Sequence, residues 1–231
     1  MTALPAVRQL VFLAGDLDAT LTKAKSELGL KDGVDDAEGM AELGFVHQVL
    51  TIDQTFLEFT APLGPETMPG KLVAKRGDLG YMVVMQVEDV EATKQRAASL
   101  GLKPVFEQPY EGHTITQWHP RDFGTLAEID QIRPADTWHM APRIFETGST
   151  DVVGDISAIE LAVRDPEATV QTWATVLDTP AEGTTMNLSG RTVRFVPAGD
   201  REGLVVVELP ATDRSRVGYE VALSGVLFRF V

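Results

Sequence analysis

Residues 9–20 read QLVFLAGDLDAT, and the chain returns to the same pattern in residues 82–93, MVVMQVEDVEAT, and in residues 158–169, AIELAVRDPEAT. Each copy has an apolar run of strand length, then an acidic residue, then a helical pattern. Asp16, Asp89 and Asp165 hold the same place in the three copies, and each can cap the helix that follows it. A pattern that recurs in this way indicates a repeated supersecondary unit.

The first copy continues through a helix that ends near Gly29 to two strand-like runs, residues 45–52 and 55–60. Only Asp53 and Gln54 separate these runs, which is the spacing of a tight hairpin. The polar stretch before them predicts a loop, with a further short strand near residues 40–43. A proline- and glycine-rich linker is expected to follow the hairpin.

The second and third copies continue in the same order, although the third is less regular. The chain therefore divides into two paired units, a connector, and a third, degenerate unit with extra strands. These parts are residues 1–132, 133–154 and 155–231. The sequence predicts an α+β fold made of repeated β-α-β-β-β units.

Composition excludes several classes of function. The net charge of −14 argues against binding of nucleic acid, whose phosphates need a basic surface. There is no cysteine, so disulfides and thiolate metal sites are ruled out. Neither a secretory signal nor an apolar run long enough to cross a membrane is visible. We expect a cytoplasmic protein with a small-molecule substrate, and a possible homodimer.

Two stretches carry a resemblance to a known family. Residues 56–60, FLEFT, and residues 119–128, HPRDFGTLAE, follow the repeated strand and helix pattern. Together they resemble the vicinal oxygen chelate superfamily, in particular glyoxalase- and methylmalonyl-CoA-epimerase-like members. The resemblance covers residues 8–132 well and residues 156–210 weakly. It implies curved mixed sheets that enclose a cleft, but it specifies the reaction poorly.

The resemblance also implies a divalent metal ion (Zn, Ni, Co, Mn or Fe) held by the first and last strands of two units. The corresponding positions in the first unit are Gln9 and Glu58, and both offer oxygen ligands suited to a hard cation. Glu128 holds the last-strand position of the second unit, whereas Met82 replaces its first-strand ligand with a soft thioether. In the third unit the two positions are Ala158 and Glu208, so we expect no metal there.

His47 is a further candidate for the same site. If Asp53 and Gln54 form a two-residue turn, Val49 pairs with Glu58, and His47 then shares one strand face with Glu58. His47 could supply the ligand that is lost at Met82, or it could act as a base. A strand histidine is more often structural, and Glu58 could also be merely solvated, so these alternatives stay open.

These residues lead to three hypotheses. The first is a metal-dependent isomerase, epimerase or lyase that acts through an enolate- or alkoxide-like intermediate, with Glu128 and His47 as catalytic residues. The second is a metal-free protein that binds or sequesters a small molecule. The third, a ring-cleaving dioxygenase, lacks the expected histidine at Met82. The predicted substrate is small, oxygenated and apolar or aromatic, and the residues expected to contact it are Tyr81, Met82, His113, Trp118 and His119.

Overall fold

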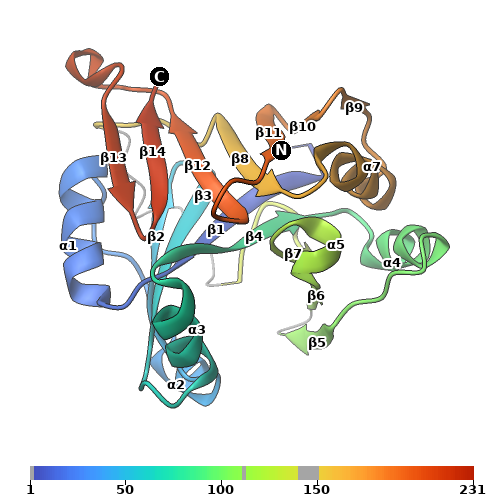
Figure 1. Ribbon diagram of the computed structural model, residues 1–231, viewed down its shortest axis with the longest axis horizontal. Coiled ribbons are helices and arrows are strands. Elements are labelled where there is room, and N and C mark those ends of the chain that lie inside the picture. Colours follow the sequence, from blue (N-terminus) through green and yellow to red (C-terminus); the bar gives the residue numbers. More distant parts are fainter. Residues whose placement is uncertain (1–2, 111–112, 140–150) are drawn as a thin grey trace. The chain divides into compact units, whose positions relative to one another are not determined.

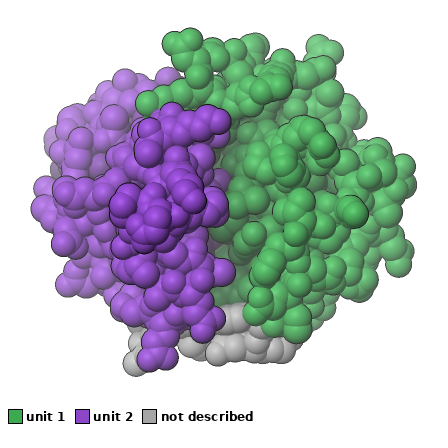
Figure 2. Space-filling model, turned by 60° about the horizontal axis from the view of Figure 1, so that its bottom comes forward, with its two compact units in different colours: residues 1–8, 82–141, 157–205 green, residues 9–81, 142–156, 206–231 purple. Residues whose placement is uncertain are grey.

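The computed structural model describes residues 3–110, 113–139 and 151–231, and the chain divides into two compact units. Unit 1 contains residues 1–8, 82–141 and 157–205, and unit 2 contains residues 9–81, 142–156 and 206–231 (Figure 2). Each unit therefore combines segments that lie far apart in the sequence. Three of the boundaries between the units, after residues 8, 81 and 205, fall inside strands.

Unit 2 holds most of the first and the last repeats of the chain, which are called modules from here on. Figure 1 labels the helices and strands of all four modules. In the first module (residues 6–62), β3 pairs antiparallel with β2 and parallel with β1. In the fourth module (residues 203–230), β14 pairs antiparallel with β13 and parallel with β12. Their elements, with α3 after the first module, are β1 (Ala6–Leu13), α1 (Leu17–Leu28), α2 (Ala37–Glu42), β2 (Phe45–Ile52), β3 (Thr55–Pro62), α3 (Met68–Arg76), β12 (Gly203–Leu209), η1 (Arg214–Arg216), β13 (Glu220–Leu223) and β14 (Val226–Phe230).

Unit 1 holds most of the second module (residues 79–131) and the third (residues 158–197). In both, the last strand again runs parallel to the first, in the pairs β4–β7 and β8–β11. Their elements are β4 (Leu79–Gln86), α4 (Val90–Ser99), β5 (Phe106–Tyr110), β6 (His113–Trp118), α5 (Pro120–Phe123), β7 (Leu126–Gln131), β8 (Ala158–Val163), α7 (Pro166–Leu177), β9 (Ala181–Glu182), β10 (Thr185–Leu188) and β11 (Arg191–Pro197). The fold is α+β and built from repeats, as the sequence predicts, and the second and third modules have the full set of four strands.

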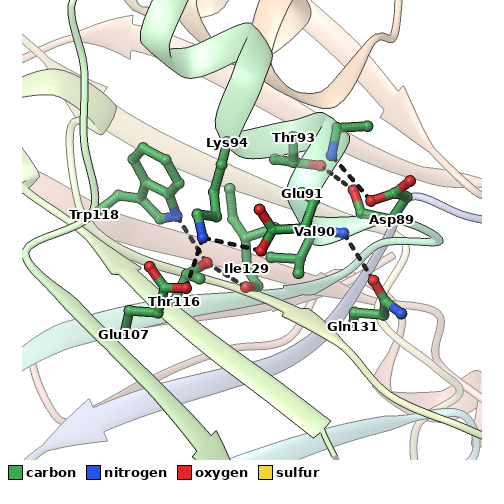
Figure 3. A network of polar contacts seen from close by, with 11 residues as sticks. Asp89, Val90, Glu91, Thr93, Lys94, Glu107, Thr116, Trp118, Ile129 and Gln131 are labelled. Atoms are coloured by element: carbon green, nitrogen blue, oxygen red, sulfur yellow. Dashed lines mark hydrogen bonds and ion pairs between the residues drawn. The ribbon is translucent and has the colours of Figure 1, made fainter.

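The three repeated aspartates are helix N-caps, as predicted. Asp16, Asp89 and Asp165 have extended backbones, and each side chain accepts a hydrogen bond from the amide three residues later. These bonds satisfy amides that have no partner inside the helix. In unit 1 the start of α4 is fixed further by the Gln131 side chain, which accepts a hydrogen bond from the Val90 amide (Figure 3).

Two stretches differ from the prediction. A short strand was expected near residues 40–43, but these residues lie in and directly after helix α2, which Asp36 caps. The second half of the expected proline-rich linker opens helix α3 instead. Thr67 caps α3, and a proline stands in its first turn, where the missing amide hydrogen is not needed. Both helices are short, so few residues carried their periodic signal.

Aromatic side chains fill the core of each unit. In unit 2, Phe12 stacks on Phe59 with ring centroids 5.1 Å apart and lies 5.4 Å from Phe228. In unit 1, Trp173 of α7 is fully buried and lies 5.4 Å from Phe195, and its indole N–H donates to the carbonyl oxygen of Phe123. Among the described residues, no helix combines the length and the apolarity needed to cross a membrane.

The expected position of Glu208 is wrong. The last strand of the third module is β11, which runs parallel to β8, and Glu208 lies in β12, the first strand of the fourth module. The registers place Arg194 of β11 at the position that Glu58 and Glu128 hold in the first two modules. Strand β12 and the residues after it thus form a fourth module. In this module the 3-10 helix η1 follows the first strand.

Candidate functional site

The β2–β3 hairpin of unit 2 brings His47 and Glu58 together. Asp53 and Gln54 form the two-residue turn, and Asp53 has a positive φ of 47°. Val49 pairs with Glu58 and His47 with Thr60, as the sequence predicts. His47 and Glu58 therefore lie diagonally on one strand face, where long side chains meet.

Gln9, His47 and Glu58 form a buried cluster, called here the Glu58 cluster. Gln9 Nε2 donates to Glu58 Oε2 at 2.6 Å, and His47 Nδ1 lies 2.6 Å from Glu58 Oε1. The exposed fractions of the three residues are 8%, 6% and 6%. Each carboxylate oxygen thus has its own nitrogen donor, which offsets the cost of burying the charge.

The protonation of His47 follows from its second ring nitrogen. The backbone N–H of Asp36 donates to His47 Nε2 at 2.7 Å, so this nitrogen must carry a lone pair. The imidazole is therefore neutral, with its proton on Nδ1, where it donates to Glu58. The helix start at Asp36 fixes the ring, and the ring in turn fixes the carboxylate.

This geometry decides how the Glu58 cluster fits a metal ion. Both ring nitrogens of His47 are engaged in hydrogen bonds, so His47 offers no ligand atom in this arrangement. Glu58 keeps further lone pairs on its two oxygens, and its side chain is more exposed than that of His47, 8% against 1%. The cluster therefore holds the Glu58 carboxylate in a fixed orientation. A ligand would meet Glu58 before it met the less exposed His47.

In unit 1, Glu128 belongs to a second cluster. Gln117 Nε2 donates to Glu128 Oε2 at 2.7 Å, and Asp130 Oδ2 lies 2.8 Å from His139 Nε2. One ligand atom from each of Glu128, Asp130 and His139 lies within 4.8 Å of the others. Burial raises the pKa of the Asp130 carboxyl well above its usual range, against a smaller lowering by hydrogen bonding with Glu128 and the Thr116 backbone.

The residues expected to contact substrate have varied surroundings. Tyr81 is half-buried in unit 2, with its ring 5.9 Å from that of Phe45. Met82 is buried in unit 1 and shares a strand face with Gln86. Trp118 is 1% exposed, and its indole donates to the Thr116 hydroxyl (Figure 3).

The two remaining histidines of this group lie at opposite ends of one segment. His119 is exposed and caps α5, where its Nδ1 accepts a hydrogen bond from the Arg121 amide. His113 begins β6, and its side chain lies outside what the structure describes. Substrate contact by these five residues stays a prediction.

Asp130 and His139 were not among the residues proposed from the sequence. Asp130 is two residues after Glu128 in one strand, and this spacing alone places both on one face. Asp130 could therefore have been identified from its spacing to Glu128 in the sequence. His139 reaches the strand through the fold of residues 132–138, which a one-dimensional pattern does not reveal.

Comparisons with known proteins agree with this architecture. The sequence model of a glyoxalase-like domain matches residues 10–177, more than half of the chain. A hypothetical protein from Staphylococcus aureus has a similar structure over 99% of both chains, with a TM-score of 0.70 and 13% identity. The Streptomyces coelicolor methylmalonyl-CoA epimerase in complex with 2-nitronate-propionyl-CoA matches 59% of this chain and 100% of its own, with a TM-score of 0.50 and 23% identity. A search of the curated proteins finds no match.

Proposed function

The chain belongs to the glyoxalase-like domain family, and we propose that it is an isomerase, epimerase or lyase in which Glu58 moves a proton on a small oxygenated substrate. One observation carries this proposal. Glu58 is a buried carboxylate that is held on both oxygens by short hydrogen bonds and is more exposed than the histidine behind it. A general base needs this combination of fixed position and access.

The step is a proton transfer at carbon. A Glu58 oxygen takes the proton from a carbon next to a carbonyl group, and the bonding electron pair moves to the carbonyl oxygen to form an enolate. Delivery of a proton from water to the opposite face gives an epimer, and return of the proton from Glu58 to the neighbouring carbon gives an isomer. Loss of a leaving group from the carbon beyond gives a lyase reaction.

Gln9 and His47 have positioning roles in this mechanism. Neutral His47 donates from Nδ1 to Glu58 and keeps one oxygen of the carboxylate in place, while Gln9 does the same for the other. A divalent cation, which the family resemblance implies, supplies stabilisation of negative charge on the substrate oxygen when bound. Glu58 acts as the base in this proposal and His47 acts through Glu58, so neither is assigned here as a ligand of that cation.

Isotope exchange tests the proposal. The protein is incubated in D₂O with 2-hydroxy ketones, thiohemiacetals of 2-oxo aldehydes, and methylmalonyl-CoA, and loss of the C–H signal is followed by proton NMR. We expect the parent to exchange at least one compound, and Glu58→Gln to slow this exchange by about 100-fold or more. Glu42→Gln, an exposed glutamate of the same unit, is the matched control. Equal rates in the parent and Glu58→Gln would contradict the proposal.

A second candidate is a metal-free protein that binds a small molecule. The observation that favours it is that both oxygens of Glu58 are already hydrogen-bonded by nitrogen atoms of Gln9 and His47. This candidate predicts saturable binding of a panel compound, detected by calorimetry, with no exchange in the parent. Binding that survives EDTA, without exchange, would favour it over the enzyme.

A further inference from the structure

Three side chains of unit 1 lie close together. Two come from strand β7 of the second module, and the third comes from the segment that follows this strand. Glu128 and Asp130 stand two residues apart on β7 and so point to the same side of the strand. His139 returns to this strand from the segment after it, and its Nε2 lies 2.8 Å from Asp130 Oδ2. The cluster thus combines two carboxylates and one imidazole.

Neighbouring contacts hold the returning segment in place. Gln86 of β4 pairs with Asp130 in the strand register, and its Nε2 donates to the carbonyl oxygen of Ala135. The oxygen of the same Gln86 side chain accepts two hydrogen bonds from the buried Arg8, at 2.9 and 2.6 Å. The Trp138 ring packs edge-on against His139, with centroids 4.7 Å apart. These contacts hold the segment that carries His139 next to strand β7.

Asp130 has an oxygen that is available to a cation. The residue is 0% exposed, and its Oδ1 makes no hydrogen bond of normal geometry to any residue that the structure describes. Glu128 is also buried, at 8% exposed. Buried carboxylates in proteins are paired with other groups or coordinate metal ions.

The distances suit a cation. Metal ions of the first transition row bind carboxylate oxygen and imidazole nitrogen at about 2.0–2.2 Å, so adjacent ligand atoms lie about 3 Å apart. The 2.8 Å between His139 Nε2 and Asp130 Oδ2 matches this spacing, and all three ligand atoms fit within 4.8 Å. Nitrogen and oxygen donors together favour Mn, Fe, Co, Ni or Zn over Mg or Ca.

We infer that Glu128, Asp130 and His139 form a binding site for a divalent transition-metal ion. This ligand set differs from the one that the resemblance implies, because it takes nothing from the first-strand position of the module, where Met82 stands. Asp130 and His139 supply the ligands that a thioether at Met82 does not. The inference does not depend on proton transfer by Glu58.

Metal titration tests the site directly. The full chain, stripped with EDTA, is titrated with Mn²⁺ and, separately, with Zn²⁺, by electron paramagnetic resonance for free Mn²⁺ and by calorimetry for Zn²⁺. We expect one saturable site per chain. Asp130→Asn and His139→Gln should each weaken binding about tenfold or more, while circular dichroism and melting confirm that both variants are folded.

His119→Gln is the matched control, because His119 is an exposed histidine of the same unit, and its binding should equal that of the parent. Absence of saturable binding in the parent, or equal binding in the parent and both cluster variants, would overturn the inference. Glu58→Gln separates the two proposals. It should keep the metal affinity of this site even though the proposed function requires it to lose proton exchange.

Discussion

The last strands of the four modules carry charged residues of opposite sign at one equivalent position. In the first two modules this residue is a glutamate that pairs with a valine on the first strand, in the pairs Val11–Glu58 and Val84–Glu128. In the other two it is an arginine that pairs with a glutamate, in the pairs Glu160–Arg194 and Glu208–Arg229.

This difference distinguishes two kinds of module that share the same strand pairing. In the third module Arg194 lies 3.7 Å from Glu160, so the charges compensate each other across the strands. In the first module the opposite residue is apolar, and Glu58 is held instead by an amide and an imidazole. A carboxylate that faces a valine on the first strand can still act on a ligand. We therefore expect the chemistry in the first two modules and a structural role for the last two.

The largest expected effect comes from giving the first module the pattern of the third. In the double variant Val11→Glu with Glu58→Arg, both new charges enter a strand pair whose residues are 2% and 6% exposed. The donors of Gln9 and His47 would then face a guanidinium. We expect the free energy of unfolding to fall by about 4 kcal/mol or more, measured by urea denaturation.

The reciprocal change is its control. Glu160→Val with Arg194→Glu gives the third module the pattern of the first, at side chains that are 19% and 36% exposed. Partly exposed ion pairs contribute little, so we expect a loss of about 1 kcal/mol or less. Equal losses in the two double variants would show that the charge pattern is incidental to the modules.

A single truncation gives the next effect. Glu58→Ala leaves the Gln9 amide and the His47 Nδ1–H buried without their acceptor, which should cost about 3 kcal/mol of unfolding free energy. Glu58→Gln keeps one oxygen acceptor and should cost about half as much. Arg194→Ala, the equivalent truncation in the third module, should cost less than about 1 kcal/mol. Urea denaturation of the three variants measures the differences. An unchanged free energy of unfolding in Glu58→Ala would contradict the structural role of the cluster.

The sequence was most informative where the signal was local. The caps at Asp16, Asp89 and Asp165 and the two-residue turn at Asp53 and Gln54 were predicted correctly because few neighbouring residues determine them. The turn fixed the strand register, and the register alone placed His47 beside Glu58. The contact followed from the turn length, without any knowledge of the remaining chain.

Prediction failed where a long-range pairing decided the outcome. Glu208 lies in an apolar run that reads like any last strand, and only the parallel pairing of β8 with β11 shows that the module has already ended. A local sign was present nonetheless. Ser189 and Gly190 before β11 both have positive φ, as do Ser224 and Gly225 before β14. Such turns are frequent in two-residue hairpins, and here they precede the last strands of the third and fourth modules.

The smallest expected effect concerns the fourth module, where η1 takes the place of an α-helix after the first strand. Arg216 of η1 binds Glu27 of α1, with Nη2 at 2.7 Å from Oε2 and Nη1 at 2.8 Å from the carbonyl oxygen. The Tyr219 hydroxyl donates to the same carboxylate at 3.1 Å. These bonds, chiefly that from Arg216, lower the pKa of Glu27. A lowered pKa means that the contact stabilises the fold above the unfolded-state value, about 4.3 for glutamate, and loses its effect as the pH falls through the folded-state value.

Arg216→Met removes this charge but keeps an apolar side chain over the rings of Tyr219 and Phe230, which the guanidinium covers at 4.3 and 5.0 Å. We expect a loss of about 1 kcal/mol at neutral pH, because both partners are about three-quarters buried. Urea denaturation at a series of pH values should show the loss shrinking as the pH falls below the unfolded-state pKa, and vanishing below the lower folded-state pKa, where Glu27 is protonated in both states. Arg214→Met, an exposed arginine of the same 3-10 helix, should change stability by less than about 0.5 kcal/mol. A loss for Arg216→Met that stays constant with pH would assign the effect to packing over the rings and not to the ion pair that ties η1 to α1.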